Sequence, residues 1–256
     1  MKILITGASG FIGSHLAELL VQQGHEVRAM VRRHSNTRFI SHLPIQFVHG
    51  SLTDPSTLPA AVEGVDMIYH LAGLNVAKNR EEFFKANPEG TRSLLLAAER
   101  HAPDLQRFAY LSSLTAVGPS ESPDFPADET WPHRPITLYG ESKAAAERVV
   151  GEFADRIPTT IVRAPAVYGE RDAEILRFFK MVSIGVAPMI GFDRKLVSLV
   201  HAGDLVRGYV MAAESPIGTG QTYFISSDGF YSWDEVGEAT ARIMGKRHVM
   251  NLRVPH

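Results

Sequence analysis

The chain has 256 residues, of which 45% are hydrophobic and 21% are charged, and its formal net charge at pH 7 is -2. This composition is typical of a folded globular protein, and the length fits one large α/β domain or a core with a smaller lobe. So small a charge offers no broad basic surface to nucleic acid or to an anionic membrane. The absence of cysteine excludes disulfides, thiol catalysis and thiolate metal sites.

The sequence also gives no sign of a targeting segment, a membrane span or a metal site. Glycines stand where a signal peptide would have its apolar run, and no stretch reaches the roughly 18 apolar residues of a membrane span. We therefore expect a cytoplasmic protein. The eleven histidines form no HExxH motif or close cluster with acidic residues, so we predict no metal. The Gly-x-Ser-x-Gly spacing of a hydrolase is missing too.

A glycine-rich turn near the N-terminus is the most informative stretch. The apolar run 2–5 predicts a buried strand, and residues 14–21 have the apolar spacing of a helix. Between them, Gly7, Gly10 and Gly13 allow a sharp turn, a close approach of backbone amides to a pyrophosphate and tight packing of the helix on the sheet. The pattern predicts a dinucleotide cradle, although a tight structural turn would give the same letters.

The end of the second predicted strand, at 27–31, bears on the choice of cofactor. In NAD-specific sites an acidic residue about 20 residues past the glycine loop bonds the ribose 2′-hydroxyl, whereas an arginine accommodates the 2′-phosphate of NADP. Here Arg32 and Arg33 follow the strand. We therefore expect NADP to be favoured and NAD to be possible; the alternative is a solvated basic loop.

Strand and helix patterns then alternate. The predicted elements are strands at 45–50, 67–73 and 107–113, a helix from Thr53 or Asp54 to Val62, and a helix over 83–100. Such alternation predicts an α/β fold with a doubly wound parallel sheet and right-handed crossovers, whose ligands lie at the carboxyl ends of the strands. Those ends carry Gly7, Arg32, Ser51, Ala72 and Ser113.

A proline-rich surface loop is predicted for residues 118–135, and it leads to a predicted helix at 138–150. Tyr139 and Lys143 are four residues apart on that helix and therefore face the same way. A cation beside a phenol favours the phenolate and brings its pKa toward the working range. Ser113 would hold the substrate oxygen while Tyr139 takes or gives its proton. We predict Ser113, Tyr139 and Lys143 as catalytic residues.

The last third of the chain continues with alternating patterns. We predict helices at 175–186, 204–213 and 232–244 and strands at 196–200 and 222–226. The final helix begins with Ser232 as its N-cap and Glu235 three residues later. Trp131 and Trp233 stay unassigned, because a single aromatic residue near a loop or helix start is more often a packing residue.

Taken together, these motifs resemble the extended short-chain dehydrogenases/reductases of the NAD(P)-dependent epimerase/dehydratase family. The resemblance covers nearly the whole chain and several motifs occur in the family's order. They are the glycine loop, His70-Leu71-Ala72-Gly73, the Asn-x-x-Gly-Thr of 87–91, the Tyr-x-x-x-Lys pair, and the segments 163–169 and 200–205.

The resemblance implies a Rossmann domain over 1–165, with 203–228 returning to it, and a substrate-binding lobe formed by 166–202 and 229–256. It implies an NAD(P)-dependent enzyme that transfers hydride at a secondary alcohol or ketone of a small molecule, a nucleotide sugar or a related compound. The cofactor-binding residues that we predict are Gly7, Ser9, Gly10, Phe11, Ile12, Gly13, Arg32, Ser51, Leu52, Leu71, Ala72, Gly73, Lys143, Pro165, Ala166 and Val167.

Two departures from the family pattern affect this interpretation. Ser51 stands where the family usually has an acidic residue that contacts adenine. The family's Val-Tyr-Gly is here Ala116-Val117-Gly118, closer to the dihydroflavonol-reductase and 3β-hydroxysteroid-dehydrogenase branches. An NADPH-dependent ketone reductase or a 3β-hydroxysteroid-dehydrogenase-like enzyme is therefore an alternative. A non-catalytic NADP-binding redox sensor is another, which the intact Ser, Tyr and Lys disfavour.

Two further expectations concern assembly and length. The helices at 87–101 and 139–153 carry more apolar surface than one sheet-facing stripe requires, and family members commonly pair them, so we expect a homodimer. The alternative is a doubly covered helix within a monomer. The apolar run 249–256 resembles the start of an element, and relatives typically continue further. We therefore expect an incomplete substrate lobe. The 256-residue chain should bind the cofactor but show weak or absent turnover, and a longer chain, if the gene continues, should restore activity.

Overall fold

The computed structural model describes residues 1–190, 196–246 and 249–254. They divide into two compact units. The first unit is Met1–Ala164 with Gly203–Ile225, and the second is Pro165–Ala202 with Ser226–His256. The nucleotide-binding and substrate-binding roles that we expect for the two parts of the chain stay predictions.

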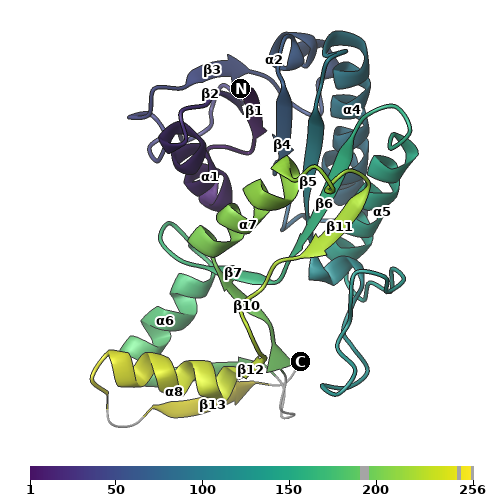
Figure 1. Cartoon of the computed structure of the whole chain (residues 1–256). Helices are drawn as coiled ribbons and strands as arrows, with labels where there is room; N and C mark the ends of the chain where they lie inside the picture. Colours follow the sequence, from purple (N-terminus) through teal and green to yellow (C-terminus); the bar gives the residue numbers. More distant parts are fainter. Residues whose placement is uncertain (191–195, 247–248, 255–256) are drawn as a thin grey trace. The chain divides into compact units, whose positions relative to one another are not determined.

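The first unit is built on a seven-stranded parallel sheet, visible in Figure 1, with the order β11-β6-β5-β4-β1-β2-β3. Its strands are β1 (Lys2–Thr6), β2 (Glu26–Val31), β3 (Gln46–His49), β4 (Met67–His70), β5 (Arg107–Ser113), β6 (Thr159–Ala164) and β11 (Gln221–Phe224). The chain order reverses between β1 and β4, which makes the carboxyl ends of these two strands the topological switch point where ligands bind in such sheets. The predicted doubly wound Rossmann fold is confirmed.

Helices cover both faces of this sheet (Figure 1). They are α1 (Phe11–Gln22), α2 (Pro59–Val62), α3 (Arg80–Phe84), α4 (Gly90–His101), α5 (Leu138–Glu152) and α7 (Ala202–Glu214), with short helical turns η1 (Pro55–Thr57), η2 (Lys85–Glu89) and η3 (Leu114–Ala116). Successive strand residues face opposite sides. Thus Ile68 and Phe108 join the core under α2, α4 and α5, whereas Tyr69 turns to Tyr209 of α7, with the two ring centroids 5.1 Å apart. Both faces of the sheet are therefore buried.

The residues predicted as a helix over 83–100 are all helical, but the helical segment starts three residues before Phe83 and is interrupted by a π-helical turn. Asn79 caps α3, which begins at Arg80, because its side chain accepts a hydrogen bond from the Glu82 amide at 2.9 Å. The π-helical turn η2 then carries Pro88, which has no amide hydrogen to donate, before α4 begins at Gly90. The helix predicted from Thr53 or Asp54 to Val62 is likewise divided, into η1 and α2.

The second unit contains α6 (Ile175–Ser183) and α8 (Trp233–Ile243), which pack around a small core of Val182, Ala187 and Ala241. Its strand pairs are β7 (Ala166–Tyr168) with β10 (Leu199–His201), β9 (Leu196–Val197) with β12 (Tyr231–Ser232), and β8 (Val186–Ile190) with β13 (Met250–Val254). The capping box predicted at Ser232 and Glu235 is confirmed. Trp233, which is half-buried, packs on Phe178 with ring centroids 5.2 Å apart and lies against the small core of this unit.

The helix predicted at 175–186 is wrong at its end. Gly185 has φ 92°, and Val186 starts a strand instead of continuing the helix. The strand predicted at 196–200 is split between β9 and β10, which pair with different partners. Among the described residues, no helix has both the length and the apolar character needed to cross a membrane.

Candidate active site

The glycine loop after β1 is shaped by close backbone approach. Gly7 has φ 76°, and a Cβ there would lie 2.8 Å from the Ala72 amide nitrogen at the end of β4. A Cβ at Gly13 would lie 2.2 Å from the Gly7 carbonyl oxygen. Both positions therefore exclude a side chain on steric grounds. Gly10 has more room, because a Cβ there would lie 3.2 Å from its nearest neighbour, the Gly7 carbonyl oxygen.

The first turn of α1, which contains the predicted cofactor residues Phe11 and Ile12, can receive an anion. Gly10 is the N-cap, preceded by Ser9, and among the described side chains none caps this helix end. The first turn also contains no acidic residue. The free amides and the helix dipole together give the turn a partial positive charge, the usual setting for a pyrophosphate. The turn therefore fits the dinucleotide that the sequence predicts.

Arg32 and Ser51 lie at the same edge of the sheet as the glycine loop, because β1, β2 and β3 are paired in parallel. The Arg32 amide donates to the Ser35 hydroxyl at 3.0 Å, which fixes the turn after β2. Within the described part of the chain, the exposed Arg32 guanidinium makes no ion pair, so its charge is available to a ligand. Ser51 receives a local bond from Thr53, and Leu52 packs against Gly90 of α4.

A buried polar chain fixes the end of β4 beside the glycine loop. His70 Nδ1 lies 2.7 Å from the Thr6 hydroxyl, and its Nε2 lies 3.0 Å from the Thr91 hydroxyl. The Ala72 amide donates to the same Thr6 hydroxyl at 3.2 Å. Burial, with a smaller contribution from the charge of Lys143, lowers the pKa of His70 to about 3. His70 is therefore neutral at pH 7 and holds the segment that contains Leu71 and Ala72.

Asn87, in η2, ties three segments together and is 2% exposed. Its side chain accepts from the Leu74 amide at 2.8 Å, donates to the Leu74 carbonyl at 3.0 Å and donates to the Ser142 hydroxyl at 2.8 Å. A Cβ at Gly73 would lie 2.8 Å from the Asn87 Oδ1, so the chain needs glycine there. This amide connects the segment after β4 with the first turns of α5.

The three predicted catalytic residues come from β5 and α5. Ser113 ends β5 and is half-buried, and its hydroxyl accepts from the Thr115 amide at 3.2 Å. Thr137 caps α5, and a Cβ at Gly140 would lie 2.4 Å from the Thr115 carbonyl oxygen. The turn that carries half-buried Tyr139 therefore packs directly on the turn that follows Ser113.

Lys143 lies one turn further along α5 and is 7% exposed. Its ammonium donates to the Leu111 carbonyl at 2.6 Å and lies 4.3 Å from the centre of the Tyr110 ring. Burial lowers its pKa to about 7, while the charge of Glu147 acts in the opposite direction. A buried cation at this place favours the phenolate form of a neighbouring tyrosine.

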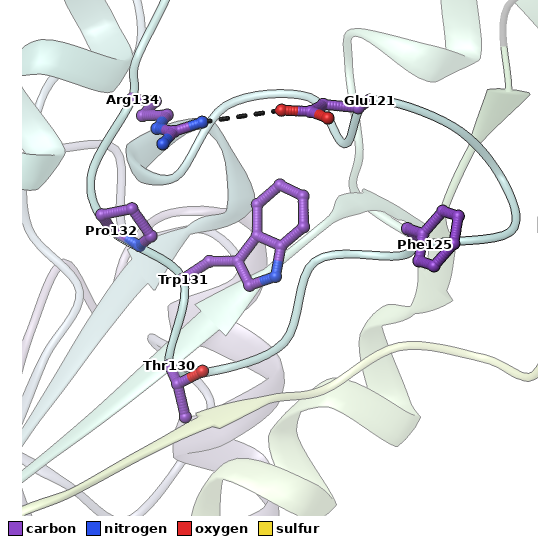
Figure 2. Close-up of a pocket in the computed structure, with 6 residues that line it drawn as sticks. All are labelled: Glu121, Phe125, Thr130, Trp131, Pro132 and Arg134. Atoms are coloured by element: carbon purple, nitrogen blue, oxygen red, sulfur yellow. Dashed lines mark ion pairs between the residues drawn. The ribbon is translucent and has the colours of Figure 1, made fainter.

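The long loop between η3 and α5 has no helix or regular strand in residues 118–137, all of which the structure describes. Residues of this loop line a pocket of about 400 Å³. Figure 2 shows Trp131 among the lining residues, with the ion pair of Glu121 and Arg134, whose charged atoms are 3.7 Å apart. Trp131, unassigned from the sequence, lines this pocket. The remaining predicted cofactor residues, Pro165, Ala166 and Val167, begin the second unit, the last two in β7.

A sequence model of the NAD dependent epimerase/dehydratase family matches residues 3–233. The chain belongs to this family. It is an oxidoreductase of a class whose members use NAD(P). The residues in the glycine loop and in the Ser, Tyr and Lys set fit such a cofactor, but their individual roles in this chain stay predictions.

Two curated relatives and one solved structure illustrate the range of the family. A ceramide reductase of Caulobacter vibrioides is 32% identical over 254 residues, which is 99% of this chain and 73% of the relative. A 3 beta-hydroxysteroid dehydrogenase/Delta 5→4-isomerase of Mycobacterium tuberculosis is 33% identical over 243 residues, 88% of this chain and 64% of the relative. The crystal structure of UDP-glucose 4-epimerase from Thermus thermophilus with NAD has a TM-score of 0.88 and 24% identity, and covers 100% of this chain and 86% of that one. At that identity the last likeness shows the fold alone.

Sequence reasoning missed the polar groups that support the site. It named His70 and Asn87 only as parts of motifs. It did not single out Glu147, which lies one helical turn after Lys143, or Arg163 and His133, which are both hydrogen-bonded to Glu147. A usable signal was present at two of these positions, because His70 and Arg163 are polar residues inside otherwise apolar strand patterns.

Proposed function

We propose that this chain catalyses net hydride transfer between NADP(H) and a secondary alcohol or ketone, with Tyr139 as the acid/base. The observation that supports it most directly is the buried Lys143, one helical turn from Tyr139, in a segment packed on the turn after Ser113. The names of the relatives, a ceramide reductase and a 3 beta-hydroxysteroid dehydrogenase, favour net oxidation or reduction over sugar epimerisation. The relatives also favour a substrate other than a nucleotide sugar.

The three proposed catalytic groups have different tasks. The Ser113 hydroxyl donates to the substrate oxygen and holds it. The Tyr139 phenol gives its proton to that oxygen during reduction and takes it back during oxidation, and the charge of Lys143 stabilises the phenolate that forms. The nicotinamide, when bound, supplies or accepts the hydride. Lys143 contributes to cofactor binding as well.

The experiment is a comparison of Tyr139→Phe with wild type in the oxidation of NADPH by a panel of ketones, including 3-ketosteroids and long-chain 3-keto compounds. We expect Tyr139→Phe to bind NADPH normally and to lose about 10²–10⁴ in rate, the usual contribution of general acid-base catalysis. Tyr223→Phe, on the edge strand β11, is the matched control and should keep wild-type rate. Retained turnover in Tyr139→Phe would refute the assignment.

The preference for NADP rests on Arg32. Its turn is fixed by Ser35, its guanidinium is exposed, and no acidic residue occupies this position to bond a ribose 2′-hydroxyl. A charge-assisted bond to the 2′-phosphate contributes about 1.5–3 kcal/mol. Arg32→Ala should therefore weaken NADPH binding by about tenfold or more and leave NADH binding nearly unchanged, whereas Arg148→Ala on the exposed side of α5 should change neither. Fluorescence titration measures both, and equal effects on the two cofactors contradict the proposal.

A further inference from the structure

A buried carboxylate lies one helical turn beyond Lys143. Glu147 is 4% exposed, and residues four apart on a helix have Cβ atoms about 5–6 Å apart. Arg163 on β6, itself 5% exposed, donates from Nε and Nη2, with Nη2 2.8 Å from Glu147 Oε2. The Ser112 hydroxyl, next to Ser113, also donates to this carboxylate. Glu147 therefore connects α5 with the ends of β5 and β6.

The same carboxylate also holds the long loop. His133 Nε2 lies 2.7 Å from Glu147 Oε2, and Arg163 Nη1 donates to the Glu129 carbonyl at 3.2 Å. The Glu129 side chain in turn accepts from the Phe224 amide of β11 at 2.9 Å. The loop segment 129–133 is thus fixed to the sheet by the Glu147–Arg163 pair.

Stability alone does not explain why the chain keeps this pair. Burying two charges costs hydration that their attraction seldom exceeds, and well-packed apolar residues often replace such a pair without loss of stability. The hydrogen bonds of the carboxylate keep it ionised, and they hold the pKa of Glu147 at about 2 in spite of burial. Glu147 therefore carries a negative charge inside the fold at neutral pH.

Lys143 is the group that this charge affects. The titratable and charged groups around Lys143 are His70 on β4, Tyr110 on β5, Tyr139 and Glu147 on α5 and, beyond Glu147, Arg163 on β6. His70 is neutral, and Arg163 repels a second cation. Glu147 is the group that opposes the effect of burial on the Lys143 ammonium.

We propose that Glu147 is a positioning residue, which keeps Lys143 in its charged form and, through Arg163 and His133, fixes loop segment 129–133. It acts through Lys143 and not on the substrate. The inference rests on the proposed function only for the role of Lys143 in turnover; the coupling between Lys143 and Glu147 can be measured without cofactor or substrate.

The test uses the full chain and an NMR titration of ¹³Cε-labelled lysine, with the Lys143 signal assigned from Lys143→Met. In Glu147→Gln we expect the pKa of Lys143 to fall by about one pH unit or more, because the opposite charge is gone and Arg163 remains. Glu147→Asp should restore most of the wild-type value. Glu152→Gln, the same change at an exposed position of the same helix, should have no effect. An unchanged pKa in Glu147→Gln overturns the proposal.

A second readout separates this inference from the proposed function. The ketone-dependent oxidation of NADPH by Glu147→Gln should fall off at lower pH than in wild type, by the same shift as the Lys143 titration. A lowered pKa with an unchanged pH profile would overturn the proposed role of Lys143 while its coupling to Glu147 stands. If Glu147→Gln does not fold, Glu147→Gln/Arg163→Met removes both buried charges, and its Lys143 pKa must still lie below the wild-type value.

Discussion

Gly13 offers a sharp test of the dinucleotide cradle. A Cβ at this position would lie 2.2 Å from the Gly7 carbonyl oxygen, 2.8 Å from the Gly7 carbonyl carbon and 2.9 Å from the Ala8 Cα. All three neighbours are backbone atoms, so no side chain can move aside. Since ordinary carbon contacts are about 3.5–4.0 Å, Gly13→Ala must displace the loop or α1 by about 1 Å. Overpacking of this kind costs about 1–3 kcal/mol.

A displacement of that size also moves the loop amides relative to a bound pyrophosphate. Hydrogen bonds from the loop would leave their normal range of about 2.7–3.2 Å, and a single lost bond to a charged group costs about 1.5–3 kcal/mol. We therefore expect Gly13→Ala to weaken NADPH binding by about tenfold or more. Both NADPH and NADH should be affected, because they share the pyrophosphate.

The assay is fluorescence titration with NADPH, run beside thermal unfolding. Gly151→Ala is the matched control, since no described atom lies within 4 Å of a Cβ there. Alanine is favoured over glycine in a helix by roughly 0.5–1 kcal/mol, so this control should bind normally and be slightly more stable. A Gly13→Ala protein that is as stable as wild type and binds NADPH equally well would refute the reasoning.

Three further predictions concern pH, the amide at position 87 and assembly. The pKa of His70 in the folded chain is lowered to about 3, so between about pH 6.5 and 3 the unfolded chain binds one proton more than the folded chain, and stability should fall as the pH drops through this range. In urea titrations, His70→Asn should lose less stability than wild type between pH 6.5 and 4.5, and an equal loss would contradict this prediction. Asn87→Ala loses three hydrogen bonds of a buried side chain and should destabilise the chain by about 2 kcal/mol or more in urea unfolding. Asn36→Ala, at an exposed position, should change the stability by less than about 0.5 kcal/mol, and equal effects of the two substitutions would contradict a structural role of the Asn87 amide. Light scattering at micromolar concentration should give twice the 28.2 kDa of one chain, and a single-chain mass would exclude the homodimer.

The structure weakens one of the reasons for predicting a homodimer, the apolar surface of the helix at 139–153. Ala144, Ala146, Val149 and Val150 of α5 are buried within a single chain, so the apolar excess of this helix is largely used for packing against the sheet and α4. The neighbouring surface carries ion pairs between α4 and α5, such as Arg92 with Glu152. Dimerisation stays a prediction that the mass measurement decides.

Local signals were enough for much of the fold and for part of the candidate site. Continuous apolar runs predicted the buried parallel strands, because a strand covered on both faces needs no polar alternation. The box of Ser232 and Glu235 marked a helix start correctly, since both bonds of a capping box lie within four residues. Tyr139 and Lys143 were predicted as site residues by the same kind of local rule, the spacing of one helical turn, and their roles stay predictions.

Predictions failed where partners distant in sequence decide the conformation. Val186 was predicted as the end of a helix because it continues the apolar pattern, but it begins β8, which pairs with β13, more than sixty positions away in the chain. The first turn of α3 is polar and was missed, because the apolar pattern begins only at Phe83 while the helix is started by the Asn79 cap. The short strands β7 and β10 likewise form by pairing with each other, although they are distant in the sequence.

The sequence by itself determined the alternation of strands and helices and the glycine loop, and it supplied the prediction of which residues bear the chemistry, because each of these depends on patterns within a few positions. Only the tertiary structure decided the environment of those residues. A glutamate at position 147 has the sequence signature of an exposed helix residue, yet it is buried against Arg163 and His133, from β6 and the long loop. The charge state of Lys143 depends on burial and on such long-range neighbours, and neither can be deduced from the letters around it.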